Sequence, residues 1–457
     1  MSALWTSTDI AAATGGTAST DFAVTGVAFD TREVGHGDLF VAMPGTAHDG
    51  HDFVEAAFAR GAAGAVVSRP ITGPHVLVAD TVAALDALAR ASRQRTDAKI
   101  VGVTGSVGKT GTKEALAAAL ARAPGMRVHR SVKSYNNHTG VPLSLARMPA
   151  NADHAVFEMG MNHAGEIAAL TAMVRPHVAV VTAIAAAHIE FFPTGLDGIA
   201  DAKAEIFEGL DPGGTAIIPY DSPQRERLIA AARLHAATIL TFGMGEGADV
   251  RARDVIDNGS SSTVTATLPG VELCLTVGQA GVHWVSNALA VLAAVHALDA
   301  DVGVAALALG DMEQLAGRGV RLRIVAGSGE ALLIDESYNA NPASMRATLA
   351  VLGNEAGRKI AVLGEMRELG QQSAELHAGI AGDVIASGVE TVVLVGEAMA
   401  PLAQALEGRV ALRHVADTAT ATILLATLIA PGDAVLVKGS NGVGLTALVA
   451  AQTRRIA

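Results

Sequence analysis

Aromatic side chains and cysteine are both scarce in this sequence. Phe, Trp and Tyr make up 3% of its 457 residues, and the formal net charge is −12. Nucleic-acid binding needs a basic surface and stacking platforms, so we expect no nucleic-acid partner. The one cysteine, Cys274, excludes an intramolecular disulfide and is compatible with the reducing cytoplasm.

Features that direct a chain to a membrane are also lacking. The first 31 residues contain no Lys or Arg, so they lack the charged start of a signal peptide. The longest apolar run, around residues 288–298, is too short to span a bilayer. We therefore expect a cytoplasmic protein with no membrane span. We also expect it to be a monomer.

Lysine is rare too, because most basic residues are Arg and only seven are Lys. A buried lysine can lose its proton and act as a nucleophile, whereas an arginine stays charged. Each lysine is therefore a weak candidate for special chemistry, although genomic base composition would produce the same bias.

The length predicts two or three domains, and the alternation of short strands and helices predicts an α/β fold. We expect a small N-terminal α/β domain (1–97), a central P-loop-type domain with a parallel sheet (98–312) and a C-terminal Rossmann-like domain (313–457). A helix is expected at 81–94 with Thr81 as its N-cap, and an antiparallel appendage at 250–277.

Residues 100–110 have the pattern of a phosphate-binding loop. A β-rich run at 100–104 leads into the loop, and an Ala- and Leu-rich helix is expected at 111–122. The loop residues are Gly105, Ser106, Val107, Gly108, Lys109, Thr110 and Gly111. Glycines let backbone N–H groups approach a phosphate, Lys109 would reach the β- and γ-phosphates, and the Thr110 hydroxyl would bind Mg²⁺.

The pattern is incomplete, because Val103 stands where the first glycine of the usual motif would be. The alternative is a glycine turn followed by a chance Lys-Thr pair, which the flanking strand and helix disfavour. The motif indicates a nucleoside triphosphate but does not distinguish a kinase, hydrolase, switch or ligase.

Polar residues follow the next expected strands. Glu158 ends a strand beside the phosphate loop, where a carboxylate is well placed for Mg²⁺. His188 follows the third strand and could bind metal or phosphate, or simply make one hydrogen bond.

Lys203 lies on the apolar stripe of a helix expected at 196–210, together with Ile199, Ile206 and Leu210. Burial would lower its pKa, and a neutral amine can react with carbon dioxide to form a carbamate that binds metal. The alternative is a lysine whose head reaches solvent, which periodicity alone favours.

The strand expected at 331–335 runs into the polar segment 335–345. Residues 364–370 and 438–442 follow two further strands of the last domain, where open-sheet enzymes bind ligands. With the phosphate loop, these segments and the later His377 resemble the ATP-dependent Mur ligases over nearly the whole chain. Within that family, the 335–345 motif is most similar to members that join D-alanyl-D-alanine to UDP-muramoyl-tripeptide.

The resemblance implies roles for individual residues. It implies ATP and two Mg²⁺ ions, with Thr110, Glu158, His188 and a carbamylated Lys203 at the metals, and Lys109 and Arg318 at the phosphates. It implies that Asn287 contacts adenine and Asp335 the ribose. The substrate residues it implies are Thr31, Arg32, Gly45, Asp49, Asn136, Asn137, Asn339 and Asn341.

Two further positions depart from the family pattern. Trp284 stands where an asparagine is frequent, and Asn441 where an arginine is frequent. The expected activity is an ATP-dependent amide ligase of peptidoglycan synthesis, acting through an acyl phosphate. The alternatives are another Mur-type or folylpolyglutamate-type ligase and, more distantly, a P-loop ATPase switch.

Overall fold

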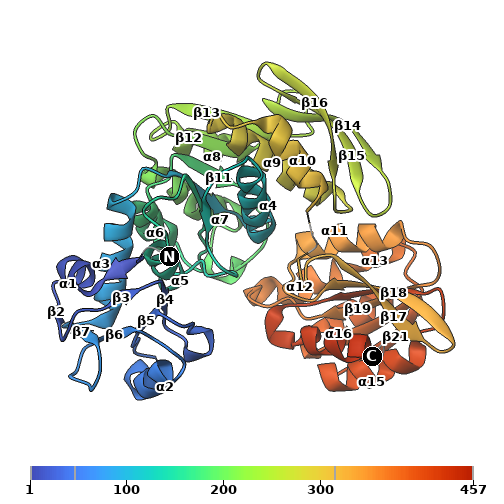
Figure 1. Cartoon of the computed structure of the whole chain (residues 1–457). Helices are drawn as coiled ribbons and strands as arrows, with labels where there is room; N and C mark the ends of the chain where they lie inside the picture. Colours follow the sequence, from blue (N-terminus) through green and yellow to red (C-terminus); the bar gives the residue numbers. More distant parts are fainter. Residues whose placement is uncertain (1–2, 46–47, 313–314, 455–457) are drawn as a thin grey trace.

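The computed structural model describes residues 3–45, 48–312 and 315–454. It contains three successive α/β units, coloured blue, green to yellow, and orange to red in Figure 1. The predicted α/β class with three domains is therefore confirmed. The predicted boundary between residues 97 and 98 falls between α3 (Thr81–Gln94) and β8 (Lys99–Thr104). Residue 313, at the second predicted boundary, lies outside the described residues.

The N-terminal unit contains a five-stranded sheet in the order β2-β7-β6-β5-β4. Its elements are β1 (Trp5–Thr6), α1 (Ser7–Thr14), β2 (Thr17–Ala18), β3 (Ala23–Val24), β4 (Gly26–Ala28), η1 (Thr31–Glu33), β5 (Asp38–Val41), η2 (Gly50–Phe53), α2 (Val54–Ala59), β6 (Gly64–Val67), β7 (His75–Leu77) and α3. The predicted N-cap of α3 is wrong by one residue: the Asp80 side chain accepts hydrogen bonds from Val82 N and Ala83 N, so Asp80 is the cap.

The central unit is built on a nine-stranded sheet, in the order β16-β15-β14-β13-β12-β11-β8-β10-β9. Its first elements are α4 (Lys109–Ala121), β9 (Val128–Arg130), α5 (Gly140–Ala146), β10 (His154–Glu158), α6 (Glu166–Val174), β11 (Val178–Val181), η3 (Ile189–Phe191), α7 (Leu196–Ala204) and η4 (Glu205–Gly209). Then follow β12 (Thr215–Pro219), α8 (Arg225–Ala232), β13 (Thr238–Gly243), β14 (Val250–Asp257), β15 (Ser262–Leu268), β16 (Val271–Val277), α9 (Val282–Ala297) and α10 (Val302–Gly310).

Helices bury both faces of the parallel centre of this sheet, which is why β8, β10, β11 and β12 are buried along nearly their whole length. Strand β8 lies between β10 and β11, parallel to both, so the three strands end at the same edge. The expected antiparallel appendage is present as β14–β16, but it is not separate. It continues the same sheet, because β14 pairs with β13 (Figure 1).

The C-terminal unit has a six-stranded sheet in the order β17-β18-β22-β19-β20-β21. Its elements are β17 (Val320–Ala326), β18 (Gly329–Glu336), α11 (Pro342–Gly353), β19 (Lys359–Gly364), η5 (Gly370–Gln372), α12 (Ser373–Ala378), α13 (Ala381–Ala386), β20 (Thr391–Val395), η6 (Glu397–Met399), α14 (Ala400–Leu406), β21 (Ala411–Val415), α15 (Thr418–Leu428), β22 (Ala434–Lys438), η7 (Asn441–Val443) and α16 (Leu445–Thr453). Only β17 runs antiparallel to its neighbour.

The helix expected at 196–210 is divided, since α7 ends at Ala204 and the tighter η4 follows. The predicted placement of Ile199, Lys203 and Ile206 on one apolar face is nevertheless confirmed, because all three side chains are buried. Among the described residues, no helix combines the length and apolar character needed to cross a membrane.

Candidate active site

The phosphate loop connects the end of β8 to the start of α4, at the edge where the three parallel strands end. Gly108 caps α4 with φ +86°, and a Cβ there would lie 2.5 Å from Asn287 Oδ1, so only glycine fits. In the described part of the chain, the N–H groups of Val107 and Gly108 donate to no backbone acceptor. With the N-terminus of α4, they form a site suited to an anion.

Lys109 and Ser106 hold the loop in shape. Lys109 Nζ donates to Gly105 O over 2.7 Å, and Ser106 Oγ donates to Ala185 O over 2.9 Å. Burial lowers the pKa of Lys109, while the nearby Glu158 carboxylate raises it and the Arg318 charge lowers it further.

Thr110 and Glu158 form the oxygen-rich centre of the site. Thr110 Oγ1 donates to Glu158 Oε2 over 2.9 Å, and Glu158 is 1% exposed. Asn136 Nδ2 donates to the other carboxylate oxygen over 2.7 Å, and the Ser134 hydroxyl lies 3.4 Å from Thr110 Oγ1. A carboxylate and hydroxyls are the ligands that Mg²⁺ prefers, so these residues fit that ion.

Arg318 reaches this centre from the C-terminal unit. Its Nη2 donates to Thr110 Oγ1 over 3.1 Å, and its guanidinium carbon lies 4.1 Å from the centre of the Tyr338 ring. Asp335 fixes the backbone beside it, since Asp335 Oδ2 accepts from Gly317 N over 3.1 Å. The other Asp335 oxygen accepts from Ser337 N and Oγ, so this carboxylate shapes the loop that carries Arg318.

His188 and Lys203 lie near Lys109. Lys203 is 2% exposed, and burial lowers its pKa well below the usual value, with the Lys109 charge lowering it further. Burial also lowers the pKa of His188, as do the charges of Lys109 and Lys203, whereas the contacting Glu368 raises it. Within the described ranges, no three His, Cys, Asp or Glu side chains are grouped closely enough to hold a metal.

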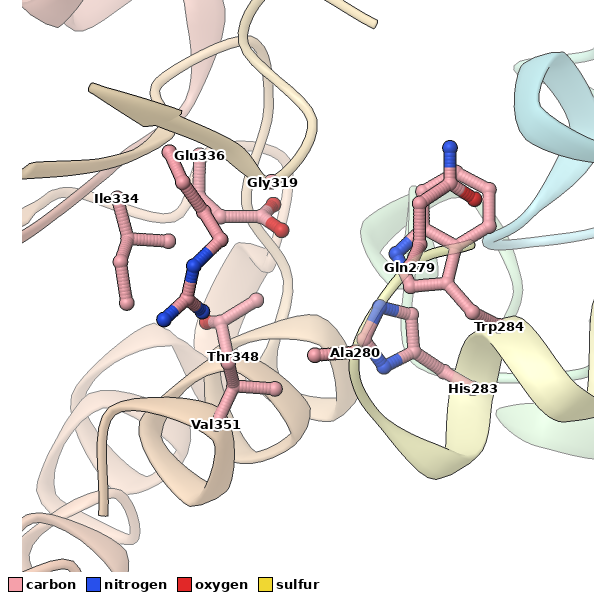
Figure 2. Close-up of a pocket in the computed structure, with 10 residues that line it drawn as sticks. Gln279, Ala280, His283, Trp284, Gly319, Ile334, Glu336, Thr348 and Val351 are labelled. Carbon is pink, nitrogen blue, oxygen red and sulfur yellow. The ribbon is translucent and has the colours of Figure 1, made fainter. Parts of the chain in front are cut away.

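Asn287 and Trp284 place α9 against the phosphate loop. A Cβ on Gly111 would lie 2.8 Å from the Trp284 ring, and Asn287 borders Gly108. The same end of α9 faces the C-terminal unit across a small cavity of about 20 Å³. Figure 2 shows His283 and Trp284 on one side of this cavity and Glu336, Thr348 and Val351 on the other.

The predicted substrate residues of the N-terminal unit lie in turns after two paired parallel strands. Thr31 and Arg32 follow β4, and Gly45 and Asp49 follow β5. The exposed Arg32 pairs with Asp30 at 2.6 Å, while Asp49 pairs with His51 at 2.7 Å. A separate contact joins this unit to the central one, because Tyr135 Oη donates to Glu33 Oε1 over 2.7 Å.

Four predicted asparagines have defined structural contacts. Asn136 supports Glu158, and Asn137 Oδ1 accepts from Gly140 N at the start of α5. Asn341 is the N-cap of α11, where its side chain accepts from Ser344 N. Asn339 is exposed and, with Asn341, lines a cleft of about 370 Å³ that also includes His188, Arg367, Glu368 and Ser440.

The sequence placed Lys438 in a segment that follows a strand, but it assigned a role to neither Lys438 nor Lys113; the scarcity of lysine was the available signal. Lys113 is fully buried behind the loop, and Lys438 is 2% exposed beneath the cleft. Lys438 Nζ donates to Asn339 O over 3.0 Å and to Glu336 Oε2 over 3.3 Å. Burial lowers the pKa of Lys438 and raises that of Glu336. Their contacts depend on the tertiary structure alone.

Three family models match the chain. These are the catalytic domain of the Mur ligase family at residues 23–93, the Mur ligase middle domain at 103–295, and the Mur ligase glutamate ligase domain at 320–441.

Full-length relatives are similar as well. A UDP-N-acetylmuramoyl-tripeptide–D-alanyl-D-alanine ligase of Synechocystis sp. is 35% identical, covering 94% of this chain and 92% of the relative. The enzyme of that name from Escherichia coli is 34% identical, covering 94% of each chain.

Solved structures share the architecture. MurF from Acinetobacter baumannii superposes with a TM-score of 0.86 at 33% identity, covering 98% of this chain and 99% of the other. MurF ligase from Thermotoga maritima in complex with ADP has a TM-score of 0.80 at 26% identity, covering 95% and 98%.

Proposed function

The chain belongs to the Mur ligase family, and we propose that it is the ATP-dependent ligase that joins D-alanyl-D-alanine to UDP-N-acetylmuramoyl-tripeptide in peptidoglycan precursor synthesis. The supporting observation in the structure is that Arg318 of the C-terminal unit reaches Thr110 of the phosphate loop, beside Glu158. A nucleotide at the loop would thus lie between two units, where a second substrate can approach it.

We assign two successive transfers to this site. The tripeptide carboxylate attacks the γ-phosphorus of ATP, which releases ADP and leaves an acyl phosphate. The amine of D-alanyl-D-alanine then attacks the acyl carbon, an amide forms, and phosphate and a proton leave. Both carboxylate and triphosphate are anionic, so the cations Lys109 and Arg318 serve mainly to neutralise charge.

Thr110 and Glu158 would hold a magnesium ion, which would supply further charge neutralisation at the phosphates. The support is their all-oxygen donor set and the Asn136 amide that orients the carboxylate.

We further propose that Lys203 is carbamylated and, with His188, holds a second ion. A buried lysine with a strongly lowered pKa presents a neutral amine, whose nitrogen bonds to carbon dioxide and releases a proton. The product is an anionic oxygen ligand. The charge of Lys109 acts on Lys203, and an anion beside this cation would be stabilised.

The UDP-sugar is assigned to the turns that carry Thr31, Arg32, Gly45 and Asp49, with Asn136 and Asn137 nearer the loop. These turns follow parallel strands at one edge of their sheet, where ligands bind in open α/β sheets. Asn287 is assigned to the adenine and Asp335 to the ribose. For Asp335 we add the role of positioning Arg318, because it accepts a hydrogen bond from Gly317 N.

The dipeptide is assigned to the cleft lined by Asn339, Asn341, Arg367 and Ser440, which opens beside His188. Arg367 is exposed there, and its backbone N donates to Ser440 Oγ over 3.0 Å. A guanidinium at a cleft wall suits the terminal carboxylate of D-alanyl-D-alanine. Asn441, which departs from the family pattern, also lines this cleft.

We propose that the domains are 1–97, 98–312 and 313–457 and that the protein works as a monomer in the cytoplasm, where ATP is available. One chain supplies the phosphate loop, the carboxylate and the arginine, so a second copy is not needed for the assigned chemistry.

Mass spectrometry of the product from ATP, UDP-muramoyl-tripeptide and D-alanyl-D-alanine tests the proposal, with phosphate release measured in parallel. We expect UDP-muramoyl-pentapeptide, and phosphate release only when both organic substrates are present. An amide product with a different acceptor or amine would identify another ligase of the family. Turnover of ATP alone would identify an ATPase switch.

A further inference from the structure

Lys113 is a fully buried lysine that the assigned chemistry does not use. It lies on α4, one turn beyond Lys109 and Thr110, and its exposed fraction is 0%. Its Nζ donates to Ser131 O over 2.8 Å and Lys133 O over 2.6 Å, and it pairs with Glu114 at 2.9 Å. The ammonium thus donates to two backbone carbonyls and lies against one carboxylate.

The two carbonyls belong to a segment, residues 131–137, that borders the Mg²⁺ carboxylate. Ser131 Oγ accepts from Glu158 N over 3.3 Å, and Asn136 Nδ2 donates to Glu158 Oε1 over 2.7 Å. From the same segment, the Ser134 hydroxyl lies 3.4 Å from Thr110 Oγ1. The segment therefore supports both proposed magnesium ligands.

The backbone of this segment needs support. Lys133 has φ +52°, a left-handed conformation that costs energy for a residue other than glycine. The carbonyl of Lys133 is one of the two that Lys113 holds. The helix that begins at the phosphate loop thus fixes the strained turn that orients Glu158.

We propose that Lys113 is a positioning residue for magnesium, acting through the 131–137 segment to hold Asn136 and Ser134 against Glu158 and Thr110. Removing it would leave the buried Ser131 carbonyl and the partly buried Lys133 carbonyl without this donor, and the turn at Lys133 would relax. The inference rests on the proposed function, since it concerns the metal ligands assigned there.

The test measures binding of a non-hydrolysable ATP analogue with saturating Mg²⁺ and with EDTA, for the wild type and Lys113→Met. We expect the variant to bind the metal-free analogue within about twofold of wild type and to lose about tenfold in the Mg²⁺-dependent increase in affinity, as is typical for residues behind a metal ligand. Lys113→Gln, which keeps a neutral donor, replaces the Met variant if that variant does not fold.

Arg93→Met is a matched control. Arg93 is also buried and also donates to two backbone carbonyls and a carboxylate, those of Val174, Arg175 and Asp211. Its loss should lower the melting temperature without changing the Mg²⁺-dependent increase in affinity for the ATP analogue.

Two outcomes would contradict the role of Lys113, and a third would contradict the proposed function. A Lys113 variant with the wild-type Mg²⁺ dependence would overturn the positioning role. A decrease of equal size in Arg93→Met would assign the effect to general destabilisation, which also overturns it. Failure of the wild type to bind the analogue at all would contradict the proposed function instead.

Discussion

Arg318 Nη2 donates a hydrogen bond to Thr110 Oγ1 over 3.1 Å, although 208 residues separate the two in the chain. Thr110 in turn donates to Glu158, so the C-terminal unit contacts the centre of the proposed phosphate site directly. The arginine is stacked on Tyr338 of its own unit, which holds the planar group in one orientation.

Replacing Arg318 should reduce catalysis far more than stability. We expect Arg318→Ala to lower kcat about 100-fold, as removal of one pre-oriented donor does in other enzymes, with little change in melting temperature. Arg318→Lys should restore only part of the activity, because a lysine cannot stack on Tyr338 as a planar guanidinium does. The control is Arg323→Ala, an exposed arginine paired with Glu330. Wild-type kcat in Arg318→Ala would exclude the arginine from the mechanism.

Asp335 and Arg318 should be energetically coupled. Asp335→Asn replaces the oxygen that accepts from Gly317 N, so Arg318 should lose its position and kcat should fall about tenfold or more. In a double-mutant cycle with Arg318→Ala, we expect the second substitution to add little to the first. Fully additive effects on kcat would instead favour the ribose contact as the main role of Asp335.

Lys203→Ala should be nearly inactive if the lysine is carbamylated. We expect short carboxylic acids added to the assay to restore part of the activity, because a small carboxylate can occupy the space of the carbamate and supply its oxygens. Lys99→Ala, which removes an exposed lysine at the start of β8, is the control. Activity like wild type in Lys203→Ala, without any rescue, would remove this residue from the mechanism.

Arg367→Ala should affect the dipeptide alone. Loss of one charged partner for a carboxylate should raise the KM for D-alanyl-D-alanine roughly tenfold or more, while the KM for ATP stays unchanged. Arg413→Ala removes an exposed arginine of β21 and serves as the control. An equal rise in both KM values would place Arg367 elsewhere than in the dipeptide cleft.

Acid should destabilise the protein partly through His129. Burial lowers the pKa of His129 from 6.5 to about 4, although its hydrogen bond to Ser144 O raises it. Between these pKa values the unfolded chain binds the proton and the folded chain does not, so stability falls as pH falls from about 6.5 to about 4. The loss from this residue is at most about 3 kcal/mol.

His129→Gln should therefore show a smaller drop in melting temperature between pH 7 and pH 5 than the wild type. Glutamine can still donate to Ser144 O but has no titrating ring. Part of the acid sensitivity should remain, because burial also lowers the pKa of His283 to about 4. His235→Gln changes an exposed histidine and is the control. An unchanged pH dependence in His129→Gln would contradict this account.

Local patterns in the sequence were enough to predict much of the architecture. The alternation of apolar runs and helices predicted the α/β class, and the strand, glycine loop and helix expected over 100–122 predicted a phosphate loop. These features depend on neighbours in the chain, through φ angles, capping and periodicity. The Asp80 cap and the break after Ala204 were missed, because neighbouring side chains compete to cap a helix and tertiary contacts set where it ends.

The sequence by itself determined that chemically useful residues lie at or after the ends of strands: Glu158, His188 and Asp335. Only the tertiary structure decided which of them meet. It placed Arg318 against Thr110. It also directed the Lys113 ammonium to two backbone carbonyls, and both oxygens of Asp335 to N–H groups of the loops beside it. Such contacts depend on how whole sheets and units pack, since residues far apart in the chain have no local pattern that specifies their distance.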